Sequence, residues 1–381
     1  MFTCMEEGQA ARQPLKGCCA LRSAVMHEST INCLHALIYL VQAHNPTTMH
    51  TLELIVLLSS LVDASPTHRL QRRAPRYDVL GGANFPDPTL LDDGGKTYAF
   101  ATVDGAGHQV PVTSSDDFNS WSAISESFPS EGVPAFSSWA ASNTVWAPDI
   151  NKLDDYDGSY AMYYSPALSS NGAIHCIGLA RSANIAGPYN DSSTEPWICP
   201  QEQGGAIDAA GFLDDDGKRY VLYKIDGPAA ANGGYCANHA NTPSTPIMIQ
   251  PTQSDGYTKI GDSVEIYNNN GVEDRYQTEA PSLIKGSDGT YFLFFSTGCY
   301  DDNSYTTSYA TSTNGIFGPY ENRQILLQNG DYDQFGPGGM DIALDGSGRA
   351  VYHSLKADND ISQGRVMNTG IISLSGRSAS I

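Results

Sequence analysis

The chain has 381 residues, of which 17% are charged and 40% hydrophobic, so it can bury a full core and is too apolar to be disordered. Its formal net charge of −21 disfavours a nucleic-acid-binding protein, because the Lys and Arg clusters that phosphates require are missing. The acidic balance is compatible with a secreted protein that acts on a neutral polymer.

The N-terminal part of the chain differs in pattern from the rest. An apolar run at 51–62, interrupted by Glu53, is too short to span a bilayer as a helix but suits the core of a secretory leader at about 49–64. Such a leader would begin at Met49, so residues 1–48 fit no part of it, and an upstream start that the cell does not use is one explanation. The alternative for the apolar run is a buried or peripheral helix.

A dibasic processing site follows at Arg72-Arg73, so we divide the chain into an N-terminal extension with leader and pro-segment at 1–73 and a mature domain at 74–381. The extension and the domain hold four cysteines each, and an even number in the domain is expected in an oxidising compartment. Three pairings of the domain cysteines are open, with the most local first: Cys176 with Cys199, leaving Cys236 and Cys299. We therefore expect a secreted, extracellular protein with no membrane segment in its mature form.

Five times in the domain a short strand runs into an Asp/Gly turn and then into a second strand rich in aromatic residues. The copies occupy 89–102, 151–165, 211–224, 282–296 and 342–354. Their turn glycines are separated by 63, 59, 72 and 59 residues, a period typical of radial β units stacked around an axis. Several units carry a third strand that ends in a Gly-Pro-Tyr turn, so three or four strands a unit are expected. The sequence therefore predicts an all-β fold, a five-bladed β-propeller.

Acidic residues precede three of these turns at nearly the same distance. Asp87 lies 8 residues before its turn glycine, Asp208 lies 9 and Glu279 lies 10. Equivalent positions on different blades converge on one axis, so three carboxylates would meet in space. Glycosidic bond hydrolysis needs a carboxylic acid and a carboxylate, and a third carboxylate can raise the pKa of the acid. The alternative is that these are turn or cap residues, since Asp149 also lies 9 residues before its glycine.

Four motifs in chain order resemble those of glycoside hydrolase family 43, five-bladed propeller enzymes acting on arabinose- and xylose-containing polysaccharides. They are FPDPT at 85–89, VWAPDI at 145–150, GGAIDAAGFLDDDGKRYVLYK at 204–224 and QTEAPSLI at 277–284. The resemblance implies that Asp87 is the general base, Glu279 the general acid and Asp208 the residue that orients the acid and modulates its pKa. It also implies that the aromatic Trp146 lines the sugar site.

One position departs from the family pattern. FGPGGMD at 335–341 has Gly339 where family members usually carry a His that helps hold a central metal ion or water. A calcium-type central ion is therefore doubtful, and we expect no metal and no cofactor. His353 is another axial candidate, although a His in a propeller strand is more often structural. Arg365 resembles an Arg that the family aims at the catalytic acids, and a solvated edge-strand Arg is the alternative.

Aromatic rings that stack on sugar faces are expected beside the proposed catalytic strands, at Phe85 and Trp146. With Arg365, these two residues make up the expected substrate-binding set. Long insertions at 123–144 and 226–246 are expected to rim the substrate cleft.

The resemblance implies a secreted inverting glycosidase that cleaves arabinofuranosyl linkages in arabinan or arabinoxylan. A β-xylosidase acting on xylo-oligosaccharides is the alternative within the class. From another class comes a sugar-binding propeller without catalysis, but that loss would be expected to delete Asp87 or Glu279, and both are present. The expected partner is a plant cell-wall polysaccharide or oligosaccharide, with no nucleic acid, and the expected state is a monomer.

Overall fold

The computed structural model describes residues 74–128, 137–230, 236 and 243–381. The expected leader, the dibasic site and the cysteines of the extension lie outside these ranges. Within them the chain is almost entirely β, and its α-helix, α3, spans only Gly227–Ala230. No helix of this part of the chain is long and apolar enough to cross a bilayer.

The strands form five successive antiparallel sheets, as the sequence predicts. Blade 1 holds β1 (Thr89–Asp93), β2 (Lys96–Phe100), β3 (Pro111–Ser115) and β4 (Ser125–Glu126); blade 2 holds β5 (Trp146–Lys152), β6 (Tyr160–Ser165) and β9 (Gly178–Ser182); blade 3 holds β10 (Ala206–Leu213), β11 (Arg219–Ile225), β12 (Ile247–Thr252) and β13 (Val264–Tyr267); blade 4 holds β14 (Thr278–Lys285), β15 (Tyr291–Thr297), β16 (Thr306–Ser312) and β17 (Glu321–Leu327); blade 5 holds β18 (Phe335–Ile342), β19 (Arg349–Leu355) and β20 (Arg365–Ile371).

In the described part of the chain, short elements lie within the blades, between them and after the last one. Two hairpins pair β7 (Ala167–Leu168) with β8 (Asn171–His175) and β21 (Ser373–Ser375) with β22 (Ser378–Ser380). Four 3-10 turns lie at Gln201–Gln203, Gly271–Asp274, Asp331–Asp333 and Ile361–Gln363.

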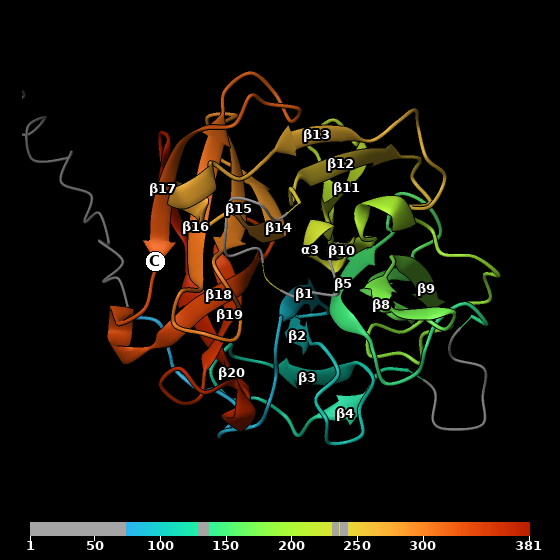
Figure 1. The fold of residues 1–381 in the computed structure, drawn as a ribbon, viewed down its shortest axis with the longest axis horizontal. Helices are drawn as coiled ribbons and strands as arrows, with labels where there is room; N and C mark the ends of the chain where they lie inside the picture. Colours follow the sequence, from blue (N-terminus) through green and yellow to red (C-terminus); the bar gives the residue numbers. More distant parts are fainter. Residues whose placement is uncertain (1–73, 129–136, 231–235, 237–242) are drawn as a thin grey trace, which may run out of the picture. The chain divides into compact units, whose positions relative to one another are not determined.

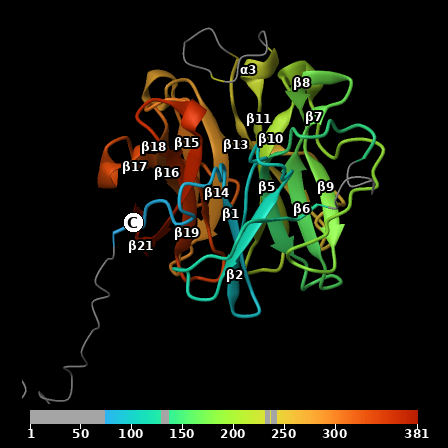
Figure 2. The ribbon, with the colours of Figure 1, turned by 90° about the horizontal axis from the view of Figure 1, so that it is seen from below.

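The first strand of every blade lies nearest the centre, and these five strands form a closed ring (Figure 1). Going round, β1 contacts β5, β5 contacts β10, β10 contacts β14, β14 contacts β18, and β18 contacts β1. Blade 5 gains a further partner from the other end of the domain, because Arg76 pairs antiparallel with Thr369 through backbone hydrogen bonds of 2.8 and 3.0 Å. Figure 2 shows the blades from the side, with β1, β5 and β14 running past one another along the ring. A five-bladed propeller is therefore confirmed.

Four of the five inner strands bend at the same place, and the matching point of blade 1 is Asp87, just before β1. The register slips between Trp146 and Asp149 in β5, and bulges lie at the matching points of β10, β14 and β18. At the bend one residue per blade adopts a left-handed backbone: Asp87, Ala147, Asp208, Ala280 and Gly339, with φ between 35° and 59°. Non-glycine residues rarely adopt this conformation, and bulges are known to re-aim side chains next to active sites. The repeated bend turns these five positions toward one end of the axis.

Aromatic and aliphatic side chains of the second and third strands fill the spaces between blades. Between blades 3 and 4, for example, Phe212, Leu222, Leu293 and Phe295 belong to one buried cluster. The alternating aromatics of the repeat are thus blade core, which fixes the inner strands and the bends that they carry.

Candidate active site

The three acids singled out by the repeat line one cavity at the end of the axis. Its wall consists of Asp87, Trp146, Ile207, Asp208, Lys224, Asp226, Glu279, Ala280, Tyr300, Tyr305 and Arg365. The cavity measures about 110 Å³, roughly the volume of three or four liquid waters. Inverting glycosidases need such room, because a water molecule must fit between the sugar and the base.

Asp87 is held in its charged form. It precedes β1 on the bend, and its carboxylate accepts hydrogen bonds from Arg365 Nη1 at 2.6 Å and Thr102 Oγ1 at 2.6 Å. Burial alone would raise the pKa of Asp87, but the Arg365 guanidinium and the hydrogen bonds more than offset it and lower that pKa below its usual value. Burial, with the nearby Arg365 charge, lowers the pKa of His353 to about 3, so this imidazole is neutral at ordinary pH and Arg365 is the cation that acts on Asp87.

Asp208 has the opposite character and holds a proton near neutral pH. Burial, followed by the Glu279 charge, raises the pKa of Asp208 to about 7. Lys224 and the N–H of Ala280, which donates to Asp208 Oδ2 at 2.9 Å, oppose that rise. One carboxyl group kept charged and another kept protonated near neutral pH are the two states that acid–base hydrolysis of a glycoside requires.

Two charged residues of this wall were not anticipated from the sequence. Lys224 on β11 is buried, with Nζ 2.9 Å from Glu279 Oε2 and 3.1 Å from Asp226 Oδ1. Lys224 ends the third-blade motif and Asp226 follows two residues later, but a lysine that follows a run of aromatic residues is usually an exposed strand end.

The aromatic walls are braced from behind. The Trp146 ring stacks on His175 with centroids 3.6 Å apart, and burial lowers the pKa of His175 to about 4, so the pair is neutral. On the opposite side Arg365 lies over the Tyr300 ring at 4.9 Å, and Tyr305 stacks on His353 with centroids 5.5 Å apart. These contacts preset the shape of the cavity, and Trp146 lies where a sugar face can pack on it.

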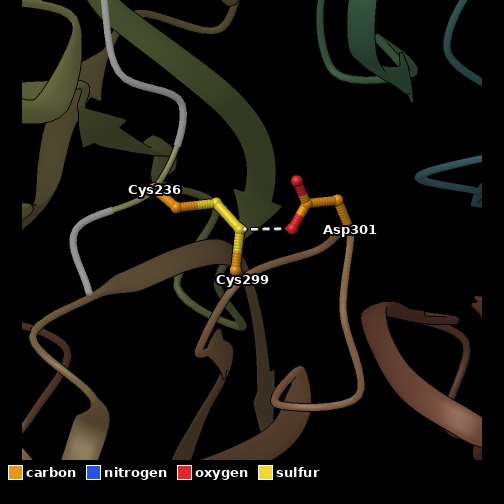
Figure 3. Close-up of side chains that lie close together, drawn as sticks. All are labelled: Cys236, Cys299 and Asp301. Atoms are coloured by element: carbon orange, nitrogen blue, oxygen red, sulfur yellow. Dashed lines mark hydrogen bonds between the residues drawn. A yellow bond between two sulfur atoms is a disulfide. The ribbon is translucent and has the colours of Figure 1, made fainter. Parts of the chain in front are cut away.

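Both disulfides that the cysteine count allowed are present, Cys176–Cys199 and Cys236–Cys299. The second joins residue 236 of the long insertion to the end of β15, next to Tyr300. Figure 3 shows Asp301 pointing at this bridge, with one carboxylate oxygen 2.8 Å from the Cys299 sulfur. The insertion is thereby fastened beside a wall of the cavity, and the remainder of its tip lies outside the described residues.

Comparison with known proteins agrees with this geometry. A family model for glycosyl hydrolases family 43 matches residues 79–371. The chain belongs to that family. It is 29% identical to a β-D-galactofuranosidase of Aspergillus niger over 56% of this chain and 58% of that protein, so it spans little more than half of this relative's length. It is also 29% identical to extracellular endo-α-(1→5)-L-arabinanase 1 of Bacillus subtilis, over 71% of this chain and 81% of the other.

Solved structures share the fold. A thermostable family 43 glycoside hydrolase superposes with a TM-score of 0.65 at 24% identity, over 78% of this chain and 92% of that one. The native arabinanase of Bacillus subtilis gives 0.58 at 24% identity, over 78% and 97%. The sequence-based assignment to the family, to the propeller fold and to the glycosidases is therefore confirmed.

Unlike the usual family 43 pattern, this chain has no histidine at position 339, and the structure gives a reason. A Cβ on Gly339 would lie 2.7 Å from the His353 ring, and φ there is +59°. His353 occupies that space, and its Nδ1 accepts the N–H of Asp87 at 3.1 Å. His353 thus contacts the proposed base.

The side chains on the axis do not fit an ion held by protein ligands. In the described part of the chain, three potential ligand atoms come together only at Cys236, Cys299 and Asp301, where both sulfurs belong to the disulfide. Position 339 offers no ligand, and the Nδ1 of His353 is engaged. No step below uses a metal, and the absence of one stays a prediction.

A second pair of carboxyls lies deeper on the axis. Thr89 Oγ1 lies 2.9 Å from Asp149 Oδ1 and 2.8 Å from Asp341 Oδ2. Burial, and next the charge of Asp341, raises the pKa of Asp149 to about 7. The single Thr89 hydroxyl proton satisfies one carboxylate, so the other carboxyl keeps its own proton and donates. Asp149, which the sequence offset did not distinguish from a catalytic acid, is therefore part of the axial packing behind the site.

One expected substrate contact is not met. Phe85 is fully buried in a core cluster with Leu90, Ala99 and Met367, and it does not line the cavity. Its position two residues before Asp87 places its side chain under blade 1, between β1 and β20. The expectation that Phe85 is a sugar platform is corrected, whereas Trp146 and Arg365 do line the cavity.

Proposed function

We propose that this family 43 enzyme is a secreted, inverting glycosidase that releases arabinofuranosyl units from arabinan or arabinoxylan. The observation that carries the proposal is the division of charge across one small cavity. Asp87 is kept as a carboxylate by Arg365, and Asp208, which lines the same cavity with Glu279, retains a proton near neutral pH. Arabinanases among the relatives, including one whose name calls it extracellular, support this substrate class and the location.

In the proposed mechanism Asp87 accepts a proton from a water molecule that attacks the anomeric carbon. Glu279 gives its proton to the glycosidic oxygen as the bond breaks, and Asp208 beside it orients this acid. Arg365 and Thr102 hold Asp87 in place, and Trp146 supports the sugar face. Each proton transfer contributes roughly 10²–10⁴-fold to the rate.

The test is a substrate panel for the domain at 74–381. Aryl α-L-arabinofuranoside, linear arabinan and arabinoxylan should be hydrolysed, and aryl β-D-xyloside and β-D-galactofuranoside should be poor substrates. A preference for the xyloside or the galactofuranoside would replace the sugar named here, and relatives of both kinds are known.

Stereochemistry tests the roles independently of the sugar. ¹H NMR of the first-formed product should show the anomeric configuration opposite to that of the substrate. Retention would mean a covalent intermediate and a different role for Asp87.

The secretory processing is tested on the full chain. N-terminal sequencing of secreted material should begin near Ala74, or near Ser65 if only the leader is removed. A mature protein that retains Cys4 to Cys33 would refute the leader.

A further inference from the structure

Lys224 has an unusual position for a lysine, because it is almost completely buried and touches two carboxylates. Its side chain is 1% exposed, and its Nζ bridges Glu279 Oε2 at 2.9 Å and Asp226 Oδ1 at 3.1 Å. Burial alone would lower the pKa of Lys224, but the charges of Asp226 and Glu279 outweigh it, so this lysine remains a cation. A buried cation against the general acid has a direct effect on where protons sit.

The contact poses a chemical problem for a proton donor. A cation at hydrogen-bond distance favours the charged form of a carboxyl and so disfavours giving a proton to the leaving group. Gln277 Nε2 donates to the same Oε2 of Glu279, which favours the charged form further. Asp226 lies on the other side of Lys224 and opposes this effect, because its negative charge balances the lysine.

The surroundings of Glu279 contain other charged or titratable groups on every neighbouring element. These are Asp208 on β10, Lys224 on β11 and Asp226 after it, Tyr300, Asp301 and Tyr305 after β15, Asp87 before β1, and Arg365 on β20. Asp87 and Arg365 are already paired with each other. Lys224 is the cation in direct contact with the acid pair, so its balance with Asp226 governs that pair.

We propose that Lys224 and Asp226 act together as positioning residues that fix the carboxyl of Glu279 and set the pH at which the Asp208–Glu279 pair loses its proton. This inference rests on the proposed function of Glu279 as the general acid. In this proposal Lys224 donates a hydrogen bond to Oε2 of Glu279, so that the other carboxyl oxygen carries the proton toward the sugar. The negative charge of Asp226 reduces the electrostatic effect of Lys224 on Glu279, so that Glu279 can still donate its proton.

The prediction is a pair of opposite shifts in the alkaline limb of kcat/KM against pH. In Lys224→Met the cation is lost, so the acid pair keeps its proton to higher pH and the limb moves up by roughly 1 pH unit or more. In Asp226→Asn the lysine is no longer balanced, so the limb moves down. The double variant Lys224→Met/Asp226→Asn loses one charge of each sign and should lie between the two, near the wild type. It also removes both members of the Lys224–Asp226 ion pair together, so neither of them is left as an unpaired buried charge if a single variant folds poorly.

A matched control is Lys285, which also bridges two carboxylates but lies away from the cavity. Its Nζ is 2.7 Å from Asp214 Oδ1 and 3.1 Å from Asp215 Oδ2. Lys285→Met should leave the alkaline limb in place. Equal falls in kcat/KM at every pH for both Lys224→Met and Asp226→Asn, or shifts of the same sign, would overturn the proposal and leave the pair a structural role.

A second readout does not depend on turnover. Carboxyl ¹³C NMR of protein labelled at Glu and Asp should show the titration of the buried pair moving up in Lys224→Met and down in Asp226→Asn. If the protein hydrolysed none of the substrates, yet the titrations moved in these directions, the proposed function would fail and this inference would stand. If hydrolysis occurred and the titrations did not move, the inference would fail alone.

Discussion

Removing the charge of Arg365 should change the pH dependence of the enzyme before it changes anything else. Arg365 Nη1 lies 2.6 Å from Asp87 Oδ1, and the two side chains are 11% and 20% exposed. An opposite charge this close changes the pKa of a carboxyl by roughly 1–3 units. At a separation of about 4 Å between the charge centres and an effective dielectric constant of 20, the Coulomb energy is about 4 kcal/mol, which corresponds to about 3 pKa units. In Arg365→Met only the effect of burial remains large, and burial raises the pKa of Asp87.

The sign follows from the role of the base. Asp87 must be a carboxylate, so activity rises as the pH passes upward through its pKa. The acid limb of kcat/KM should therefore move to higher pH by about 2 units in Arg365→Met. Removing Arg365 also removes one of the causes that lower the pKa of His353, but burial, the larger cause, still lowers it.

The assay is kcat/KM on an aryl glycoside from pH 3 to 8, with Arg365→Lys as the comparison. The lysine keeps the charge but loses the planar contact with the Tyr300 ring, so the limb should stay and KM should rise. An acid limb that is unchanged in Arg365→Met, with activity lower by the same factor at every pH, would refute the claim that Arg365 keeps Asp87 charged.

Three further predictions follow from the same contacts. Asp87→Ala and Glu279→Ala should each lower kcat by roughly 10²–10⁴-fold with melting temperatures near the wild type. Only Glu279→Ala should recover activity on substrates with good leaving groups, because these need no protonation. A tenth of wild-type activity in either variant would mean that another pair of residues acts as acid and base. The pKa of Asp149 is raised to about 7 when folded, so the native state holds this proton more tightly than the unfolded chain, and stability is lost as the pH rises from about 4 to 7; Asp149→Asn should flatten the fall in melting temperature over that range, and an unchanged slope would contradict the account. Gly339→Ala should displace the His353 ring, whose atoms lie 2.7 Å from the added Cβ, and so lower both the melting temperature and kcat; a variant as stable and active as the wild type would refute that packing.

The fold was predictable because each repeat consists of residues that are adjacent in the sequence. Five Asp/Gly turns between paired strands give the number of blades, and the aromatic second strands give the core. The number of strands per blade was less certain, since blades 2 and 5 contain three strands and the others four. The backbone pairing of Arg76 with Thr369 joins residues far apart in the chain, so no local sequence pattern predicts it.

The site was predictable where it depends on the repeat and not where it depends on side-chain direction. The offsets of Asp87, Asp208 and Glu279 from their turns brought the three to one cavity, as the structure shows. Phe85 failed because the bend at Asp87 rotates its neighbour into the core. Lys224 was overlooked because its burial depends on two carboxylates, Asp226 just after its own strand and Glu279 on β14, and the contact with Glu279 is visible only in three dimensions.

One position with a left-handed backbone recurs in or just before each inner strand, and the blades keep the same backbone there whether or not the residue has a reactive side chain. Asp87 and Asp208 use this backbone position for acids, while Ala147 and Ala280 leave it chemically silent. A mutation at either alanine would add a functional group at the mouth of the axis without altering strand register, so new substrates can be explored at little structural risk. Position 339 is closed to that route, because His353 already fills the room. In this chain the five places are therefore not equivalent, because a side chain at position 339 can be accommodated only if the His353 ring moves.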